Sequence, residues 1–333
     1  MQRLPRGVIT LGLVGLLGTA VAAAAAPSIT NVDGPAQVTA LAVRLSGPSG
    51  EAAGSPVIGG CTIFPPDNPW NTRIDAAPVR AGSAQTIAKI QSIGGTKLHP
   101  DFGQNPTYGI PFAVVPADQP LVPISFLGSG ADESDPGPYP FPLDAPVEAG
   151  SDAHVLVLQQ GTCRLFELAN SARQGSGWAG SWGAVFDLSS NALRPLGWTS
   201  ADAAGLPILP GLVRYSEVAA GHVDHAIRVT FSQTQRAYIL PATHFASSRT
   251  DPTLPPMGLR MRLRADYDIS WLSGQARVIA VALQQYGFMV ADNGSNWYFQ
   301  GAPDPGWNDT DLNQLKAVPG TAFEIVDTGP THG

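Results

Sequence analysis

Short hydrophobic or alternating segments recur along the chain from about residue 110 onward, and turns rich in glycine, proline and aspartate separate them. Segments of this length, bounded by turn-forming residues, predict β-strands. The predicted strands span 110–115, 121–126, 153–158, 163–168, 182–188, 225–231, 236–242, 258–264, 287–292, 296–301 and 323–327. The turn QQGT joins 153–158 to 163–168 and indicates a hairpin.

Helical periodicity is confined to the segments 83–94, 273–287 and 309–318. In the first, isoleucines recur every three residues before a terminal glycine, and the second begins with Ser273 as a candidate N-cap. Few helices, with no regular alternation of strands and helices, argue against a parallel α/β fold. We therefore predict a mostly-β single domain, of the β-sandwich or jelly-roll type, with about three short helices.

The composition supports this prediction. The chain of 333 residues contains 37 glycines and 31 prolines, and both residue types break helices. Coiled coils, helical bundles and helical solenoids are therefore excluded, and glycines without a three-residue period exclude collagen. Hydrophobic residues make up 44% of the chain, which is enough for a packed core.

The N-terminal segment 1–26 has the pattern of a secretory signal peptide. Arg3 and Arg6 precede an apolar stretch that ends in a run of alanines. A stretch of about 20 apolar residues also has the length of a membrane anchor. Its many glycines and alanines favour export with removal of the segment, which leaves no stable membrane anchor. We expect a secreted or periplasmic protein with a flexible leader at 27–60, a single domain at 61–327 and a tail at 328–333.

The net charge and the two cysteines limit which binding partners and which cellular compartment are expected. The formal net charge is -7, and the one basic group, Arg260, Arg262 and Arg264, alternates as on the exposed face of a strand. Nucleic-acid binding is therefore not expected. Cys61 and Cys163 predict a single disulfide in an oxidising compartment, rather than a catalytic or redox pair. By the loop-entropy relation, closing so long a loop stabilises the fold by about 4–5 kcal/mol.

Candidate catalytic residues lie mainly in the loop-rich segment 178–225, because functional sites concentrate in loops on a rigid sheet. Glycoside hydrolysis needs two carboxyl groups that flank the scissile bond. The candidate catalytic residues are Glu167, Asp187, Asp202, Glu217 and His225. Strand alternation places Glu167 on the face of Cys163 and Leu165, where burial raises the pKa of a carboxyl group as a general acid requires. The alternative for each carboxylate is a capped or salt-bridged strand end, and for Asp202 the start of a short helix.

Candidate substrate-binding residues combine aromatic rings with polar groups. They are Trp178, Arg194, Trp198, Arg214, Tyr215, His244, Asp292 and Trp297, with Trp182 as a further aromatic candidate. Aromatic side chains can stack on the apolar faces of sugars, and carboxyl groups can accept hydrogen bonds from hydroxyls. The alternative for each aromatic residue is that it fills the edge of the core.

The sequence raises two metal sites as alternatives and supports neither. A transition metal would use histidines among His154, His222, His225 and His244, and Ca²⁺ would use Asp132, Glu133, Asp135 and Asp144. His222 and His225 would face opposite sides of a strand, and neither an HExxH motif nor an EF-hand is present. We therefore expect no metal and no other cofactor, and an acidic solvated loop around Asp135.

No serine-nucleophile elbow, P-loop or dinucleotide-binding motif is present. Other motifs do carry a resemblance. They are DNPWN at 67–71, ADESDPGPYP at 131–140, NALRPLGWTSADAAGLPILPGLVRY at 191–215, PPMGLRMRL at 255–263 and GFMVADNGSNWYFQG at 287–301. The chain thereby resembles a family of exported, functionally uncharacterised bacterial proteins. The resemblance covers about 61–327 as one unit, which implies a single domain, and it implies no activity.

The residues together predict a secreted glycoside hydrolase that cleaves a polysaccharide or oligosaccharide with paired carboxylates in an aromatic-lined cleft. One alternative is a polysaccharide lyase, with His225 or Tyr215 as the base and Arg194 or Arg214 neutralising a uronate. The other is a non-catalytic carbohydrate-binding or cell-surface protein, which needs exposed aromatic residues but no perturbed carboxyl pair.

Overall fold

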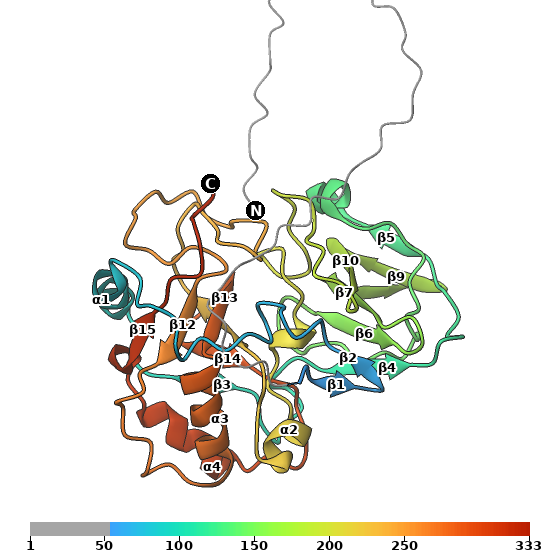
Figure 1. Ribbon diagram of the computed structural model, residues 1–333. Coiled ribbons are helices and arrows are strands. Elements are labelled where there is room, and N and C mark those ends of the chain that lie inside the picture. Colours follow the sequence, from blue (N-terminus) through green and yellow to red (C-terminus); the bar gives the residue numbers. More distant parts are fainter. Residues whose placement is uncertain (1–53) are drawn as a thin grey trace, which may run out of the picture. The chain divides into compact units, whose positions relative to one another are not determined.

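Strands dominate the part of the chain that the structure, a computed structural model, describes, namely residues 54–333 (Figure 1). Fifteen strands form four sheets in these residues, and the four α-helices are short. The predicted mostly-β class is therefore confirmed. The predicted signal peptide at 1–26 and most of the predicted leader, up to residue 53, lie outside the described residues.

The largest sheet has six strands and mixes parallel with antiparallel pairs. Its order is β15 (Phe323–Ile325), β12 (Arg260–Leu263), β13 (Phe288–Asn293), β11 (Ile227–Phe231), β14 (Tyr298–Gln300) and β3 (His99–Asp101). The pairs β11–β13 and β14–β3 are parallel, and the other three are antiparallel. Helix α3 (Gly274–Gln285) contacts β12 through an apolar stripe, and α1 (Ser83–Ile93) contacts β15 (Figure 1).

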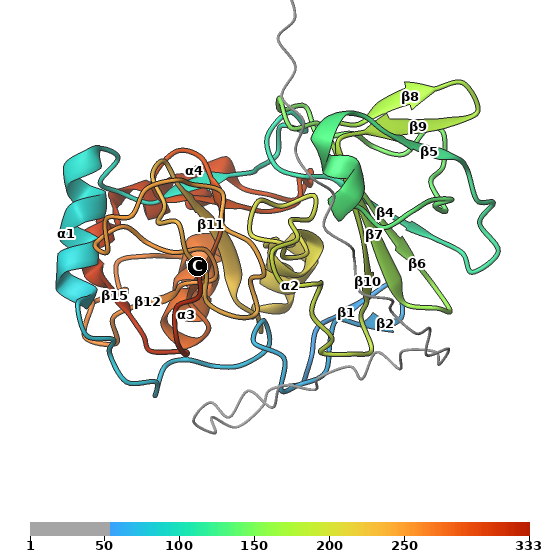
Figure 2. The same ribbon diagram turned by 90° about the horizontal axis from the view of Figure 1, so that it is seen from above.

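Two smaller sheets form the sandwich-like part of the fold. The four-stranded sheet has the order β10 (Trp182–Asp187), β7 (Arg164–Ala169), β6 (Val155–Gln159) and β4 (Phe112–Val115). The three-stranded sheet has the order β5 (Ile124–Phe126), β9 (Gly177–Gly180) and β8 (Ala172–Gln174) (Figure 2). Val157, Phe166 and Trp178 belong to one core cluster, to which both sheets contribute.

The other face of the four-stranded sheet belongs to the main core. Leu156 and Leu165 join the large cluster that also contains the apolar residues of the six-stranded sheet. Burial on both faces explains why the sequence of β6 is a continuous apolar run rather than an alternating one. It also explains why Glu167, on the Leu165 face, is fully buried.

The remaining elements are short. They are β1 (Val57–Ile58), β2 (Cys61–Thr62), α2 (Tyr215–Ala220), α4 (Asp309–Gln314) and the 3-10 helices η1 (Gly128–Glu133), η2 (Leu209–Gly211), η3 (Leu315–Ala317) and η4 (Gly320–Ala322). The β6–β7 hairpin is antiparallel as predicted. The predicted disulfide is confirmed, since Cys61 and Cys163 are bonded with their Cα atoms 5.4 Å apart. It ties β2 to the residue that precedes β7.

Four expectations change. Within the described residues, the first strand begins at Val57, before the expected start at residue 61. Segment 236–242 is not a strand, because Tyr238 forms only isolated bridges, with Met257 and His332. The tail at 328–333 is therefore held to the fold, since backbone hydrogen bonds join Tyr238 and His332 in both directions. Asp202 starts no helix and lies in a turn.

The arginines of β12 correct the expectation of a solvated strand face. Arg260 is 2% exposed and Arg262 is 9% exposed, because the segment 69–77 covers the face of β12 from which both side chains project. The Arg260 guanidinium donates to the carbonyl groups of Pro69, Thr72 and Tyr286. Arg262 likewise donates to three backbone carbonyls between residues 74 and 77 and pairs with a glutamate of β15. Both side chains fasten the segment 69–77 to the sheet.

Arg260→Ala is therefore expected to lower the free energy of unfolding by about 3 kcal/mol, because it leaves buried carbonyl groups without their hydrogen-bond donor. Arg264→Ala is the matched control, because Arg264 pairs with the exposed Asp266 and its side chain is 43% exposed. Its loss is expected to cost less than about 1 kcal/mol. Urea denaturation measures both values, and equal losses would contradict the assigned role of Arg260.

Candidate functional site

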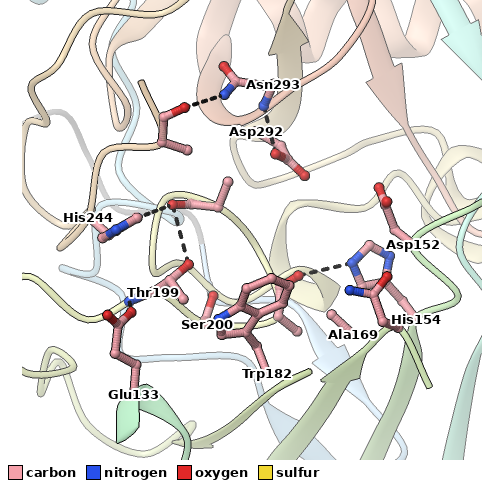
Figure 3. Close-up of a pocket in the computed structure, with 14 residues that line it drawn as sticks. Glu133, Asp152, His154, Ala169, Trp182, Thr199, Ser200, His244, Asp292 and Asn293 are labelled. Atoms are coloured by element: carbon pink, nitrogen blue, oxygen red, sulfur yellow. Dashed lines mark hydrogen bonds between the residues drawn. The ribbon is translucent and has the colours of Figure 1, made fainter. Parts of the chain in front are cut away.

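A cavity of about 480 Å³ lies where the ends of several strands meet (Figure 3). Its walls come from His154 beside β6, the end of β7, the start of β10, the end of β13 and the loop 199–203. Its polar and aromatic lining consists of Glu133, Asp152, His154, Asn170, Trp182, Thr199, Ser200, His244, Asp292 and Asn293. In Figure 3, the carboxyl groups of Glu133, Asp152 and Asp292 come from different sides of this cavity.

Asp292, near the end of β13, is the titratable group that distinguishes the cavity. One oxygen accepts a hydrogen bond from the backbone N–H of Asn293 at 2.6 Å, and the other lies 3.8 Å from Arg228 Nη2. Burial and the neighbouring Asp202 raise the pKa of Asp292 to about 7, against the opposing charge of Arg228. The side chain nevertheless remains 20% exposed and lines the cavity.

Asp202 lies directly behind Asp292, in a buried ion pair with Arg228. The Arg228 guanidinium approaches both Asp202 oxygens, at 3.0 and 3.3 Å, and donates to Gln300 Oε1 at 3.0 Å. Burial raises the pKa of Asp202 despite this pairing. Because Arg228 is closer to Asp202 than to Asp292, we assign the negative charge of the two carboxyl groups to Asp202 and the proton to Asp292.

His154 is held as an imidazolium. Its Nδ1 lies 2.5 Å from Glu148 Oε2 and its Nε2 lies 2.9 Å from the carbonyl oxygen of Ala201. Burial opposes the charged form, but the hydrogen bond and charge of Glu148 outweigh it, so the pKa of His154 is raised. Since both neighbours are acceptors, both ring nitrogens donate. His154 thereby fixes the loop 199–203 that forms one wall.

His244 lies on another part of the cavity lining. Its Nδ1 is 2.8 Å from the carbonyl oxygen of Ala203, so this nitrogen carries the proton. In the neutral ring, Nε2 is then an acceptor. The half-buried His244 can therefore accept a hydrogen bond from a ligand.

Glu133 forms another part of the cavity wall, and Arg194 supports it from behind. Glu133 Oε2 accepts a hydrogen bond from the backbone N–H of Thr199 at 3.0 Å. Arg194 donates to the carbonyl groups of Glu133 and Thr199 and pairs with Asp135. The buried Arg194 therefore supports the wall and does not line the cavity, and Trp198 packs on its guanidinium at 5.7 Å.

Two of the predicted catalytic carboxylates lie away from the cavity. Glu167 is 0% exposed, and its oxygens accept hydrogen bonds from the backbone N–H groups of Ile208 and Leu209. Burial raises its pKa to about 7, although these hydrogen bonds oppose the shift. Asp187 is exposed and accepts hydrogen bonds from the hydroxyl and backbone N–H of Ser189, which lower its pKa. Asp187 is thus a capped strand end, which is the alternative that the sequence left open.

Glu217, Arg214 and His225 form a separate cluster at the start of α2. Glu217 pairs with Arg214 and lies 3.3 Å from His225 Nε2. Burial opposes ionisation of Glu217, but the charges of Arg214 and His225 outweigh it and lower its pKa to about 2. Arg214 also donates to two backbone carbonyls. None of the three lines the cavity.

The predicted aromatic platforms are mostly core residues. Trp178 is 1% exposed and Trp297 is 0% exposed, so neither can stack on a ligand. Tyr215 packs edge-on against Trp307. Trp182 is the one tryptophan that lines the cavity.

Of the predicted site residues, Asp292, His244 and the further aromatic candidate Trp182 line the cavity, and Asp202 lies behind it. Sequence reasoning did not place Asp152, Thr199, Ser200 or Asn293 in a site. It assigned Glu133 and His154 only to metal alternatives. The signal for these residues is their convergence in space, since they come from four separate segments of the chain, at 133, 152–154, 199–200 and 293.

Neither metal alternative is assembled in the described residues. Within 54–333, no group of three or more histidine, cysteine, aspartate or glutamate side chains has an arrangement that could hold a metal ion. Asp135 of the acidic loop pairs with Arg194 and accepts from the backbone N–H of Val185. No helix among these same residues has both the length and the apolar character that are needed to cross a membrane.

Comparisons with protein-family models, with curated proteins and with solved structures find no match to this chain. The functional argument therefore depends on the cavity alone.

The buried Glu167 is expected to make stability depend on pH. Its pKa is about 7 in the folded protein and about 4.5 in the unfolded chain. Its contribution to stability is fully present below pH 4.5 and is lost as the pH rises through about 7, by on the order of 3 kcal/mol. Glu167→Gln is expected to flatten this dependence in urea denaturation between these two pH values. Asp187→Asn should retain the wild-type slope, and an unchanged slope in Glu167→Gln would contradict the assignment.

Proposed function

We propose that the cavity is the active site of a glycoside hydrolase in which Asp292 is the general acid. The observation that carries this proposal is a carboxyl group with a pKa of about 7 that also reaches the cavity. A general acid needs a pKa near the working pH and access to the leaving group. Glu167 has the raised pKa without the access.

Glu133 is proposed as the second carboxylate. It also lines the cavity, and the Thr199 N–H orients its side chain. Asp292 transfers its proton to the glycosidic oxygen as the bond to the anomeric carbon breaks. Glu133 takes a proton from the water whose oxygen bonds to that carbon. Asp292 is then ionised and Glu133 is protonated, and transfer of this proton through solvent from Glu133 to Asp292 restores the starting state. Trp182 supplies an aromatic surface for a sugar ring.

The lining favours hydrolysis over the lyase alternative. A lyase that acts on uronates needs a cationic group to neutralise the carboxylate, and none of the described lining residues is lysine or arginine. The arginines that the sequence suggested for this role, Arg194 and Arg214, are engaged by protein acceptors outside the cavity. The positive charge of His154 is paired with Glu148.

Export is part of the proposal. The Cys61–Cys163 disulfide supports an oxidising compartment, where such bonds form and persist. We propose a secreted or periplasmic enzyme whose substrate is a polysaccharide or oligosaccharide. The non-catalytic alternative predicts binding of such ligands without turnover.

Asp292→Asn and Glu133→Gln are each expected to lower kcat by about 10²- to 10⁴-fold, because each removes one of the two acid–base groups. The assay is reducing-end release from a panel of polysaccharides and oligosaccharides. Asp187→Asn, which changes an exposed carboxylate outside the cavity, is the control and should keep wild-type activity. Wild-type turnover that survives in Asp292→Asn contradicts the role of Asp292, and binding without any turnover supports the non-catalytic alternative.

The pH profile tests how Asp202 acts on the general acid. Activity should fall as the pH rises through about 7, where Asp292 loses its proton. Asp202→Asn removes the negative neighbour that raises the pKa of Asp292, so the descending limb of kcat/KM is expected to move to lower pH. A thermal melt confirms that the variant is folded. A folded variant with an unmoved limb would show that another group titrates.

A further inference from the structure

We propose that the cavity is selective for a cationic sugar, one that bears a free amino group, such as a 2-amino-2-deoxyhexose unit. This substrate class deepens the proposed function, because it concerns the same cavity. It is nevertheless separable from turnover, since selectivity in binding can be measured without hydrolysis.

The first step is the balance of charged groups on the cavity walls. Glu133 and Asp152 contribute carboxylates and Asp292 contributes a carboxyl group that holds its proton, whereas no lysine or arginine is among the described residues of the lining. The lining includes two histidines. His154 is paired with Glu148 at 2.5 Å, and Nδ1 of His244 donates to a carbonyl group. A ligand therefore meets an excess of acidic groups.

The second step is what lies behind the walls. Among residues 54–333, Asp292 is paired only with the guanidinium of Arg228, which is already shared between Asp202, Asp292 and Gln300. Asp202 and Arg228 are 0% and 3% exposed, so solvent does not screen them well. The charged groups behind Asp292 thus pair with one another, and their positive charge is not available to an anionic ligand.

The third step is that two wall carboxylates lack a cationic partner. In residues 54–333, neither Glu133 nor Asp152 forms an ion pair with lysine, arginine or histidine. The side-chain contact of Glu133 is with the neutral N–H of Thr199. An ammonium group offers three hydrogen-bond donors, which suits such acceptors better than one hydroxyl does. Trp182, in the same lining, can add a cation–π contribution.

Three matched probes test this selectivity. They are the β-1,4-linked tetrasaccharides of glucose, of N-acetylglucosamine and of glucosamine, which differ only at the 2-substituent. Calorimetric titration of the full chain at about pH 6 and low salt is expected to give roughly tenfold tighter binding for the glucosamine probe than for either neutral probe. This preference should shrink at about 1 M salt, because the attraction is electrostatic. Chromatography checks that each probe stays intact during the titration.

Asp152→Asn is expected to reduce the preference for the glucosamine probe by about fivefold, as for a partly exposed ion pair. Asp118→Asn is the matched control, because Asp118 is exposed and lies outside the cavity lining. It should leave the preference unchanged. Equal reductions in both variants would indicate a general charge effect and overturn the inference.

The outcomes separate the inference from the proposed function. Equal or weaker binding of the glucosamine probe, or failure of all three probes to bind, overturns the inference. Hydrolysis of a neutral probe that is lost in Asp292→Asn, without any cationic preference, retains the hydrolase and rejects the selectivity. A cationic preference without turnover of any substrate retains the selectivity and rejects the hydrolase.

Discussion

The buried guanidinium of Arg228 is the constraint around which the candidate site is arranged. It projects from β11 and contacts Asp202 of an irregular loop and Gln300 of β14, and it approaches Asp292 of β13. A buried charge is tolerated only when it is paired and its hydrogen bonds are satisfied. The loop must therefore return its carboxylate to the sheet, and this requirement places the segment 199–203 against the strand that carries Asp292. The position of this cavity wall therefore follows from the need to pair one buried arginine.

The same cluster determines where protons reside. The cluster contains more acidic than cationic side chains: the acidic ones are Glu148, Glu167, Asp202 and Asp292, and the cationic ones are His154 and Arg228. Neutralising the excess negative charge requires that some of the carboxyl groups are protonated. Glu148 is ionised beside His154, and Asp202 is the acid closest to Arg228. The protons are accordingly retained on Glu167 and Asp292, the two carboxyl groups whose pKa is raised to about 7. Acidity at the cavity and stability of the core are thus coupled through one set of charges.

Periodicity predicts much of the fold because strand alternation and helical spacing are local properties. It placed the β6–β7 hairpin, helix α3 and the face on which Glu167 lies. It failed for Arg260, because alternation separates two faces of a strand without showing whether solvent or a second layer covers each face. The buried arginine donates to backbone carbonyls that lie 191 and 188 residues away in sequence. Such a long-range contact leaves no periodic signal.

The cavity is harder to predict for a related reason. Its residues come from strand ends and loops between positions 133 and 293, and no two of its carboxyl groups share a motif. The comparison of Glu167 with Asp292 shows which property the sequence lacks. Burial raises the pKa of both to about 7, with a further contribution from Asp202 in the case of Asp292. Glu167 is 0% exposed and is hydrogen-bonded to the backbone N–H groups of Ile208 and Leu209, whereas Asp292 keeps 20% of its side chain exposed. A general acid must be desolvated enough to hold its proton and open enough to give it away. Strand alternation predicts the first condition, and only the packing of distant segments decides the second.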